Sequence, residues 1–174
     1  CFGENKVQEL TEKFNSLPKD IEWHFIGHLQ RNKVKYIIKF INLIHSVDSY
    51  KLLNEINKRA EQEKRIVDCL IQVKIASEEN KYGFDINEID NVINFSENLN
   101  HINIKGFMGM TTLTDNKNII INEFSKLQNL FESYKSNKLN ILSMGMSNDY
   151  NLAIEKGSNM IRLGSIIFGK RNYL

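Results

Sequence analysis

The chain has 174 residues, of which 41% are hydrophobic and 25% charged, so we expect one domain with a buried core over residues 1–174. Its formal net charge of +2, without a dense run of Lys and Arg, gives no reason to expect nucleic acid as a partner. No apolar run is long enough to cross a bilayer, so no membrane partner is expected either.

Apolar runs that predict β-strands alternate along the chain with segments whose apolar residues are spaced as in amphipathic helices. The predicted strands are residues 1–3, 21–26, 43–47, 68–75, 102–108, 139–144 and 159–163. The helical spacing is carried by Val7, Leu10 and Phe14, by Val34, Ile37, Ile38 and Ile41, by Leu52, Leu53 and Ile56, by Ile86, Ile89, Val92 and Ile93, and by Phe124, Leu127, Leu130 and Phe131. This alternation predicts parallel strands, in either a (β/α)₈ barrel or a doubly wound sheet.

Two consecutive predicted strands near the C-terminus end in turns of small residues. The first runs into Ser143-Met144-Gly145-Met146-Ser147, and the second into Arg162-Leu163-Gly164-Ser165. Such turns present backbone N–H groups and hydroxyls at one edge of a sheet, and Arg162 adds a cation, so together they predict a site for a phosphate-bearing ligand. Two alternatives stay open: ordinary turns that use glycine for its backbone freedom, and an Arg162 that pairs with a carboxylate such as Glu155.

The other candidates for chemistry are histidines, a lysine and two cysteines. His24 and His28 are four residues apart, but no nearby thiol or carboxylate completes a zinc set, so no metal is expected. Lys81 is considered as an amine that attacks an aldehyde, against the simpler role of a solvated loop residue. Cys69 lies in an apolar run and is expected to be buried, as in a protein of a reducing compartment. We identify no positioned His–Asp pair that would activate a serine.

Three long motifs follow one another along the chain: FGEN and VQEL from Phe2, WHFIGHLQRNK from Trp23, and SMGMS through AIE, GS and RLGS to IFG from Ser143. In this order they resemble the YggS/PROSC family of pyridoxal 5′-phosphate (PLP) homeostasis proteins, over the whole chain. The resemblance implies a (β/α)₈ TIM-type barrel of the alanine racemase N-terminal type. In that family the lysine that forms a Schiff base with PLP lies on the first barrel strand, upstream of FGEN.

A complete barrel of this type usually needs ~250 residues and at least ~200, which is more than this chain offers. The shortage falls where the resemblance puts the lysine strand, since the chain begins at Cys1 just before FGEN. We therefore expect that the first β/α unit is absent from this chain. The absence of an initiator Met favours a piece of a longer protein over a version that has lost the covalent anchor.

In a parallel barrel, ligands lie at the C-terminal ends of the strands. This rule gathers on one rim the residues Asn5, His24, His28, Ser77, Met110, Ser147, Arg162, Gly164 and Ser165. The resemblance implies that PLP contacts a subset of them, namely Asn5, His24, Ser147, Arg162, Gly164 and Ser165. In this subset Ser147 and the amides of Gly164 and Ser165 hold the phosphate, Arg162 faces the pyridine nitrogen and His24 faces the barrel mouth.

These expectations favour a cytoplasmic protein that binds and carries or buffers PLP, with PLP-dependent apo-enzymes as recipients. We assign no catalytic residue, because a guanidinium leaves the ring nitrogen unprotonated and PLP a poor electron sink. The racemases with this barrel also need a second base from a further domain. Two other functions stay open: a TIM-barrel enzyme that acts on a phosphorylated metabolite, and an interaction domain that uses the barrel as a scaffold.

Overall fold

The computed structural model describes residues 1–78 and 82–169. Its seven strands form one parallel sheet in strictly sequential order: β1 (Phe2–Glu4), β2 (Trp23–Phe25), β3 (Leu43–Val47), β4 (Val67–Gln72), β5 (Ile102–Met108), β6 (Ile141–Met146) and β7 (Met160–Arg162). The helices are α1 (Val7–Ser16), η1 (Arg31–Lys33), α2 (Val34–Ile37), α3 (Tyr50–Gln62), η2 (Ile86–Glu88), α4 (Ile89–Ser96), α5 (Lys117–Tyr134), α6 (Tyr150–Glu155) and α7 (Ser165–Phe168).

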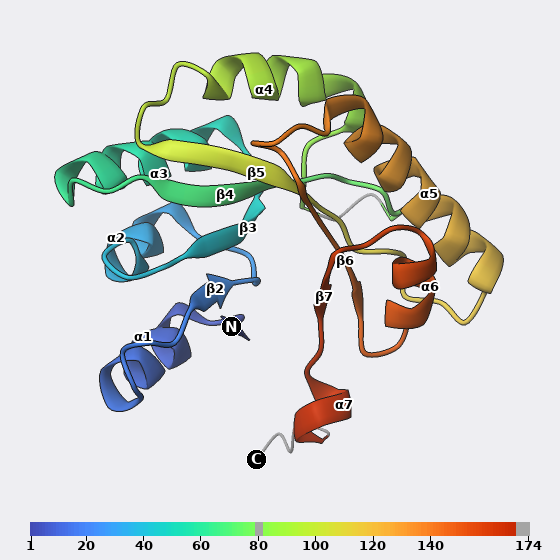
Figure 1. Ribbon diagram of the computed structural model, residues 1–174, viewed down its shortest axis with the longest axis horizontal. Coiled ribbons are helices and arrows are strands. Elements are labelled where there is room, and N and C mark those ends of the chain that lie inside the picture. Colours follow the sequence, from blue (N-terminus) through green and yellow to red (C-terminus); the bar gives the residue numbers. More distant parts are fainter. Residues whose placement is uncertain (79–81, 170–174) are drawn as a thin grey trace.

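The sequential strand order decides between the two predicted architectures. A doubly wound sheet reverses its strand order at a switch point, whereas the strands of a barrel follow one another. Figure 1 shows the sheet curled, with helices on its outer side and with β1 and β7 at its two ends. The curl brings distant strands together, since His45 on β3 and Ser143 on β6 lie within hydrogen-bond distance. The fold is therefore a barrel of seven parallel strands.

All seven predicted strands are present; β3 and β5 have the predicted bounds, and the bounds of the other five differ. β4 ends at Gln72 rather than at residue 75, and Val73 then forms only an isolated bridge with Phe84. The apolar pattern continues past the strand because Val73 and Ile75 also belong to the main hydrophobic core. The segment marked by Val34 is a single turn of α-helix, α2, preceded by the 3₁₀ turn η1.

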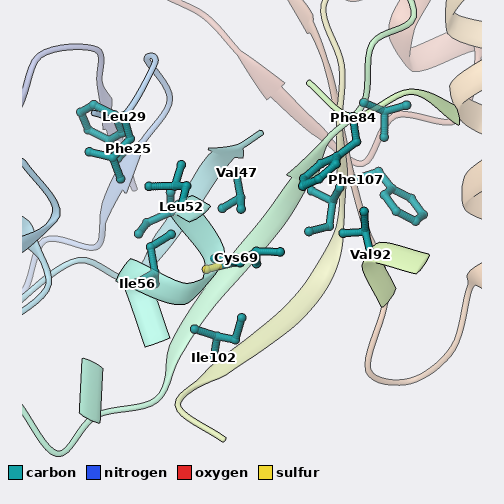
Figure 2. Close-up of a cluster of buried hydrophobic side chains, with 14 of the residues drawn as sticks. Phe25, Leu29, Val47, Leu52, Ile56, Cys69, Phe84, Val92, Ile102 and Phe107 are labelled. Carbon is teal, nitrogen blue, oxygen red and sulfur yellow. The ribbon is translucent and has the colours of Figure 1, made fainter. Parts of the chain in front are cut away.

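The main hydrophobic core lies between the sheet and the helices that cover it (Figure 2). Alternate strand residues such as Phe25, Cys69 and Phe107 point into this core, where Leu52 and Ile56 of α3 meet them. Burial raises the pKa of the Cys69 thiol, so this cysteine is an inert core residue, as predicted. The opposite face of the strands points into the barrel and forms the site described next.

Candidate functional site

The inner face of the sheet carries an apolar layer and, closer to the C-terminal ends of the strands, a polar one. The apolar layer consists of the buried Leu43, Leu70 and Met108 and of the partly buried Ile141 and Met160, and Met110 after β5 packs against it. Side chains on a strand return to the same face every second residue. On β3, β4, β6 and β7 the next inner positions after the apolar layer are therefore polar. Together with His24 of β2, these positions form the polar layer: His24, His45, Gln72, Ser143 and Arg162.

Arg162 is held in the polar layer by neutral oxygen atoms. Its Nη1 donates to the backbone oxygen of Ser143 at 3.0 Å and to the Ser143 hydroxyl at 2.8 Å, and its Nη2 donates to the Gly109 oxygen at 3.0 Å. No carboxylate of a described residue pairs with it, so the alternative of an ion pair with Glu155 is wrong. The guanidinium links the ends of β5, β6 and β7.

A hydrogen-bond chain continues from Arg162 across the barrel. The Ser143 hydroxyl lies 3.0 Å from Nδ1 of His45, and Nε2 of His45 lies 3.1 Å from Nδ1 of His24. Strand β7 is thereby connected through β6 and β3 to β2. We call this set of four side chains, His24, His45, Ser143 and Arg162, the polar chain.

Burial sets the charge states of the polar chain. Burial, with smaller effects from the positive charge of Arg162 and from His24, lowers the pKa of His45 to about 2. Burial also lowers the pKa of His24. Desolvation lowers the pKa of Arg162 to about 10 against an opposing effect of Asp149, so the guanidinium stays protonated at neutral pH. The polar chain therefore carries one positive charge, on Arg162, and two neutral imidazoles.

The two turns predicted to hold phosphate lie together. The Gly164 N–H donates to the Ser147 hydroxyl at 3.3 Å, and Ser165 follows as the first residue of α7. A Cβ atom built on Gly164 would meet no atom within 4 Å, so the space beside this backbone is open. Asp149 orders the first turn, because its carboxylate accepts the Met146 N–H at 2.6 Å and the Thr111 hydroxyl at 2.9 Å.

Asn5 and His24 have different surroundings. His24 belongs to the polar chain and is buried. Asn5 is exposed after β1, and its side chain makes no hydrogen bond with a described residue. Its backbone is close to the next loop, since a Cβ on Gly27 would lie 2.2 Å from the Asn5 oxygen. The contact of Asn5 with a cofactor stays a prediction, and Lys81 lies outside the described residues.

A second feature of the rim is a His–Asp pair that we did not predict. Nδ1 of His28 lies 3.0 Å from Asp48, and its ring stacks on Tyr82 at 3.7 Å. The pair borders an open cleft of about 530 Å³. The neighbouring Ser49 is no nucleophile candidate, because its hydroxyl caps α3 by accepting the Leu52 N–H. The sequence analysis did not identify this pair, and the serine beside it serves as a helix cap.

Two loops at the rim are joined by a carboxylate that the sequence analysis also missed. Glu123 of α5, only 3% exposed, accepts the Thr112 N–H at 2.7 Å, the Thr112 hydroxyl at 2.7 Å and the Ser77 N–H at 3.2 Å. The sequence signal for this role was the position of Glu123, a charged residue within the apolar face of α5. His45 gave a similar signal, as a polar residue inside the apolar run of β3.

In the part of the chain that the structure describes, no group of three or more His, Cys, Asp and Glu side chains is arranged to hold a metal ion. Searching the same residues, we find no helix with the length and apolar character needed to span a membrane.

Comparisons with known proteins give a consistent result. Residues 1–172 match the family described as "Alanine racemase, N-terminal domain". A "Pyridoxal phosphate homeostasis protein" of Aquifex aeolicus is 38% identical over 176 residues, which cover 99% of this chain and 77% of the relative. The structure of PipY of Synechococcus elongatus without PLP is 32% identical with a TM-score of 0.88, and covers 97% of this chain and 81% of its own. PipY with PLP bound is 29% identical with a TM-score of 0.84, over the same shares of the two chains.

Proposed function

Because the chain belongs to the family of pyridoxal phosphate homeostasis proteins, which is built on the alanine racemase N-terminal domain, we propose that it binds PLP at the mouth of its barrel. The observation that carries this proposal is the position of Arg162. It is a cation held by neutral oxygens at the strand ends, and it lies on the strand that leads into the open turn at Gly164. A half-buried cation that forms no ion pair with a described carboxylate favours an anionic ligand.

The residues present fit PLP. The three hydrogen bonds of Arg162 use both N–H groups of Nη1 and one N–H group of Nη2. The remaining N–H groups, on Nε and Nη2, form no hydrogen bond with a described residue. They suit an acceptor such as a pyridine nitrogen. The Ser147 hydroxyl, the Gly164 backbone and Ser165 suit a phosphate. Asn5 would complete the set from the opposite end of the sheet.

We propose that the protein carries or buffers PLP and does not use it for strong catalysis. Bound PLP supplies an aldehyde that reacts reversibly with amines and, when its ring nitrogen is protonated, an electron sink. A guanidinium does not readily release a proton, so Arg162 would keep that nitrogen unprotonated. The relatives are named as homeostasis proteins, which agrees with this role. PLP-dependent apo-enzymes are the proposed recipients, and the unpaired Cys1 and Cys69 agree with a cytoplasmic location.

We also propose that residues 1–174 belong to a single barrel domain. One further strand–helix unit, upstream of Cys1, would close this barrel between β1 and β7. In the described residues, β1 pairs only with β2 and β7 only with β6. Proteins normally cover such edges. The side chains of Phe2 and Phe168 are 50% and 74% exposed, next to the two edges. Intact mass of the natural protein tests this: a natural chain of 20.3 kDa would overturn it.

A titration with PLP, followed by absorbance, tests the phosphate site. Gly164→Leu fills the open space beside the Gly164 backbone and should weaken PLP binding tenfold or more without lowering the melting temperature. Ser147→Ala removes one hydrogen bond to a charged acceptor, worth about 1.5–3 kcal/mol, and should weaken binding by a similar factor. Ser133→Ala, an exposed serine on α5, is the control and should bind as the unchanged protein does.

Unchanged PLP affinity in both site variants would place the phosphate elsewhere. Saturable binding of other phosphate esters with equal affinity, together with turnover of one of them, would favour the alternative of an enzyme acting on a phosphorylated metabolite.

Borohydride reduction and peptide mapping test how PLP is held. Because the resemblance puts the anchoring lysine on a strand that these residues do not include, we propose non-covalent binding by residues 1–174. Retained affinity without a pyridoxyl adduct is the expected result. A stoichiometric adduct on Lys81, or on any other lysine of the chain, would contradict it.

A further inference from the structure

The proton positions in the polar chain follow from the chemistry of its members. A guanidinium only donates hydrogen bonds, so the Ser143 hydroxyl oxygen accepts from Arg162 at 2.8 Å. The hydroxyl proton then needs an acceptor of its own. Ser143 is fully buried, and Nδ1 of His45, at 3.0 Å, is the acceptor for that proton among the described residues. Ser143 therefore donates to His45, whose Nδ1 carries no proton.

The next link follows from the first. A neutral imidazole that accepts at Nδ1 carries its proton on Nε2. Nε2 of His45 lies 3.1 Å from Nδ1 of His24 and so donates to it. His24 in turn accepts at Nδ1 and carries its own proton on Nε2. Both histidines are thus in the neutral tautomer that is protonated on Nε2. Every hydrogen bond of the polar chain is donated in the direction from Arg162 toward His24.

The reverse direction is disfavoured. If His45 donated to Ser143, the Ser143 hydroxyl proton would be left without an acceptor in a buried position, which costs about 1–3 kcal/mol. Protonating either histidine is opposed as well. Burial penalises the charged form of both histidines, and the positive charge of Arg162 adds to this effect at His45, while Glu22 partly offsets it at His24.

The end of the polar chain is accessible. His24 keeps 9% of its surface exposed, and its Nε2 makes no hydrogen bond with a described residue. The described side-chain polar atoms that are fully buried without a partner are Nε1 of Trp23 and the Ser46 hydroxyl, and Nε2 of His24 is not among them. A ligand or solvent can therefore reach this N–H.

We infer that His45 is a positioning residue that determines which ligand group can lie beside His24. It holds His24 as a neutral hydrogen-bond donor. The site therefore selects a ligand that places a hydrogen-bond acceptor, and not an ammonium group, beside His24. This role of His45 deepens the proposed function, and the selection of the ligand rests on that function. Arg162 supplies the only positive charge of the polar chain, and none of the four side chains of the polar chain is a carboxylate that could pair with a cationic substituent.

Nitrogen NMR of the ligand-free full chain tests the tautomers directly. We expect His24 and His45 both neutral and both protonated on Nε2 at pH 7. His45→Gln keeps an N–H donor and should preserve the His24 tautomer, whereas His45→Leu should leave His24 as a mixture of tautomers. A proton on Nδ1 of His45 or His24 in the unchanged protein would overturn the inference, even if both variants failed to fold.

A second measurement tests selectivity with ligands that cannot form a Schiff base. Pyridoxine 5′-phosphate carries a neutral hydroxymethyl group where pyridoxamine 5′-phosphate carries an ammonium. The first should bind at least tenfold more tightly, with a ratio kept in His45→Gln and reduced in His45→Leu. Equal affinities in the unchanged protein would contradict the selectivity. If neither ligand binds, the proposed function fails, while the NMR result still decides the direction of the polar chain.

Discussion

At the scale of single residues, the interior of the barrel mouth is defined by one cation and two neutral histidines. Arg162 donates three hydrogen bonds to neutral oxygens and forms no ion pair with a described carboxylate, although nearby Asp149 favours its charged form. His45 and Ser143, 1% and 0% exposed, transmit this arrangement across the barrel to His24. A single polar side chain on each of four strands is thus enough to give the lumen one electrostatic sign.

The lowered pKa of His45 predicts a pH-dependent stability. In the unfolded chain this histidine titrates near its usual pKa of about 6.5, while the folded state holds it neutral down to about pH 2. Between these values the unfolded state binds more protons, so the free energy of unfolding falls as the pH falls below about 6.5. At pH 5 the loss from His45 amounts to about 2 kcal/mol, and His24 adds a loss of the same sign.

Urea denaturation between pH 5 and 8 measures this effect. His45→Gln removes the titrating group but can still hydrogen-bond, so its free energy of unfolding should fall less between pH 8 and pH 5 than that of the unchanged protein. Parallel curves for the two proteins would show that His45 is not held neutral by the fold.

At the scale of elements, the loops that form the rim depend on helices behind the sheet. Glu123 connects α5 to the loops after β4 and β5 through three hydrogen bonds from Ser77 and Thr112. The buried carboxylate of Glu123 is therefore a common support of the two loops.

Replacing Glu123 tests that support. Glu123→Gln turns one acceptor oxygen into a donor that faces an N–H or hydroxyl, which should lower the free energy of unfolding by about 1–3 kcal/mol. It should also speed hydrogen exchange at the Ser77 and Thr112 amides. Glu132→Gln on the same helix is the matched control, since Glu132 is exposed and paired only with Lys135. Exchange at Ser77 and Thr112 that stays as slow as in the control would refute the role of Glu123.

The elements were largely predictable, and the reasons differ from strand to strand. β3 and β5 occur with the predicted bounds because nearly continuous apolar runs mark strands covered on both faces. β2 is shorter than the predicted strand at residues 21–26. An apolar run indicates which residues are buried, whereas the bounds of a strand depend on its backbone hydrogen bonds. The turn residues Ser147 and Gly164 were predicted to lie together, and they do, because consecutive parallel strands end at one edge.

The polar chain could not be predicted in full. Sequence reasoning singled out Arg162 and His24 but not their connection, which runs through the barrel interior between strands far apart in the chain. His45 and Ser143 are 98 residues apart, and only the curl of the sheet brings them together. Period-two counting from the apolar layer would have placed both on the inner face. Which inner residues touch depends on curvature, which the sequence pattern does not encode.

At the scale of the whole molecule, the barrel concentrates its chemistry at one end. The apolar layer closes the lumen below the polar layer, so a ligand meets Arg162, His24 and the two small-residue turns from the side of the C-terminal strand ends. The proposed upstream unit would add the remaining wall between β1 and β7. A lumen that offers hydrogen-bond donors and a fixed cation agrees with the proposed role in carrying PLP.

Calorimetric titration of the protein with PLP and with pyridoxal, in the unchanged chain and in Arg162→Ala, tests the central claim most directly. We predict one PLP per chain, at least tenfold weaker binding of pyridoxal because it lacks the phosphate, and at least tenfold weaker PLP binding in Arg162→Ala. Arg59→Ala removes a surface arginine paired with Glu55 and should leave all affinities unchanged. Equal affinity for PLP and pyridoxal, or PLP binding that survives the loss of Arg162 undiminished, would contradict the account.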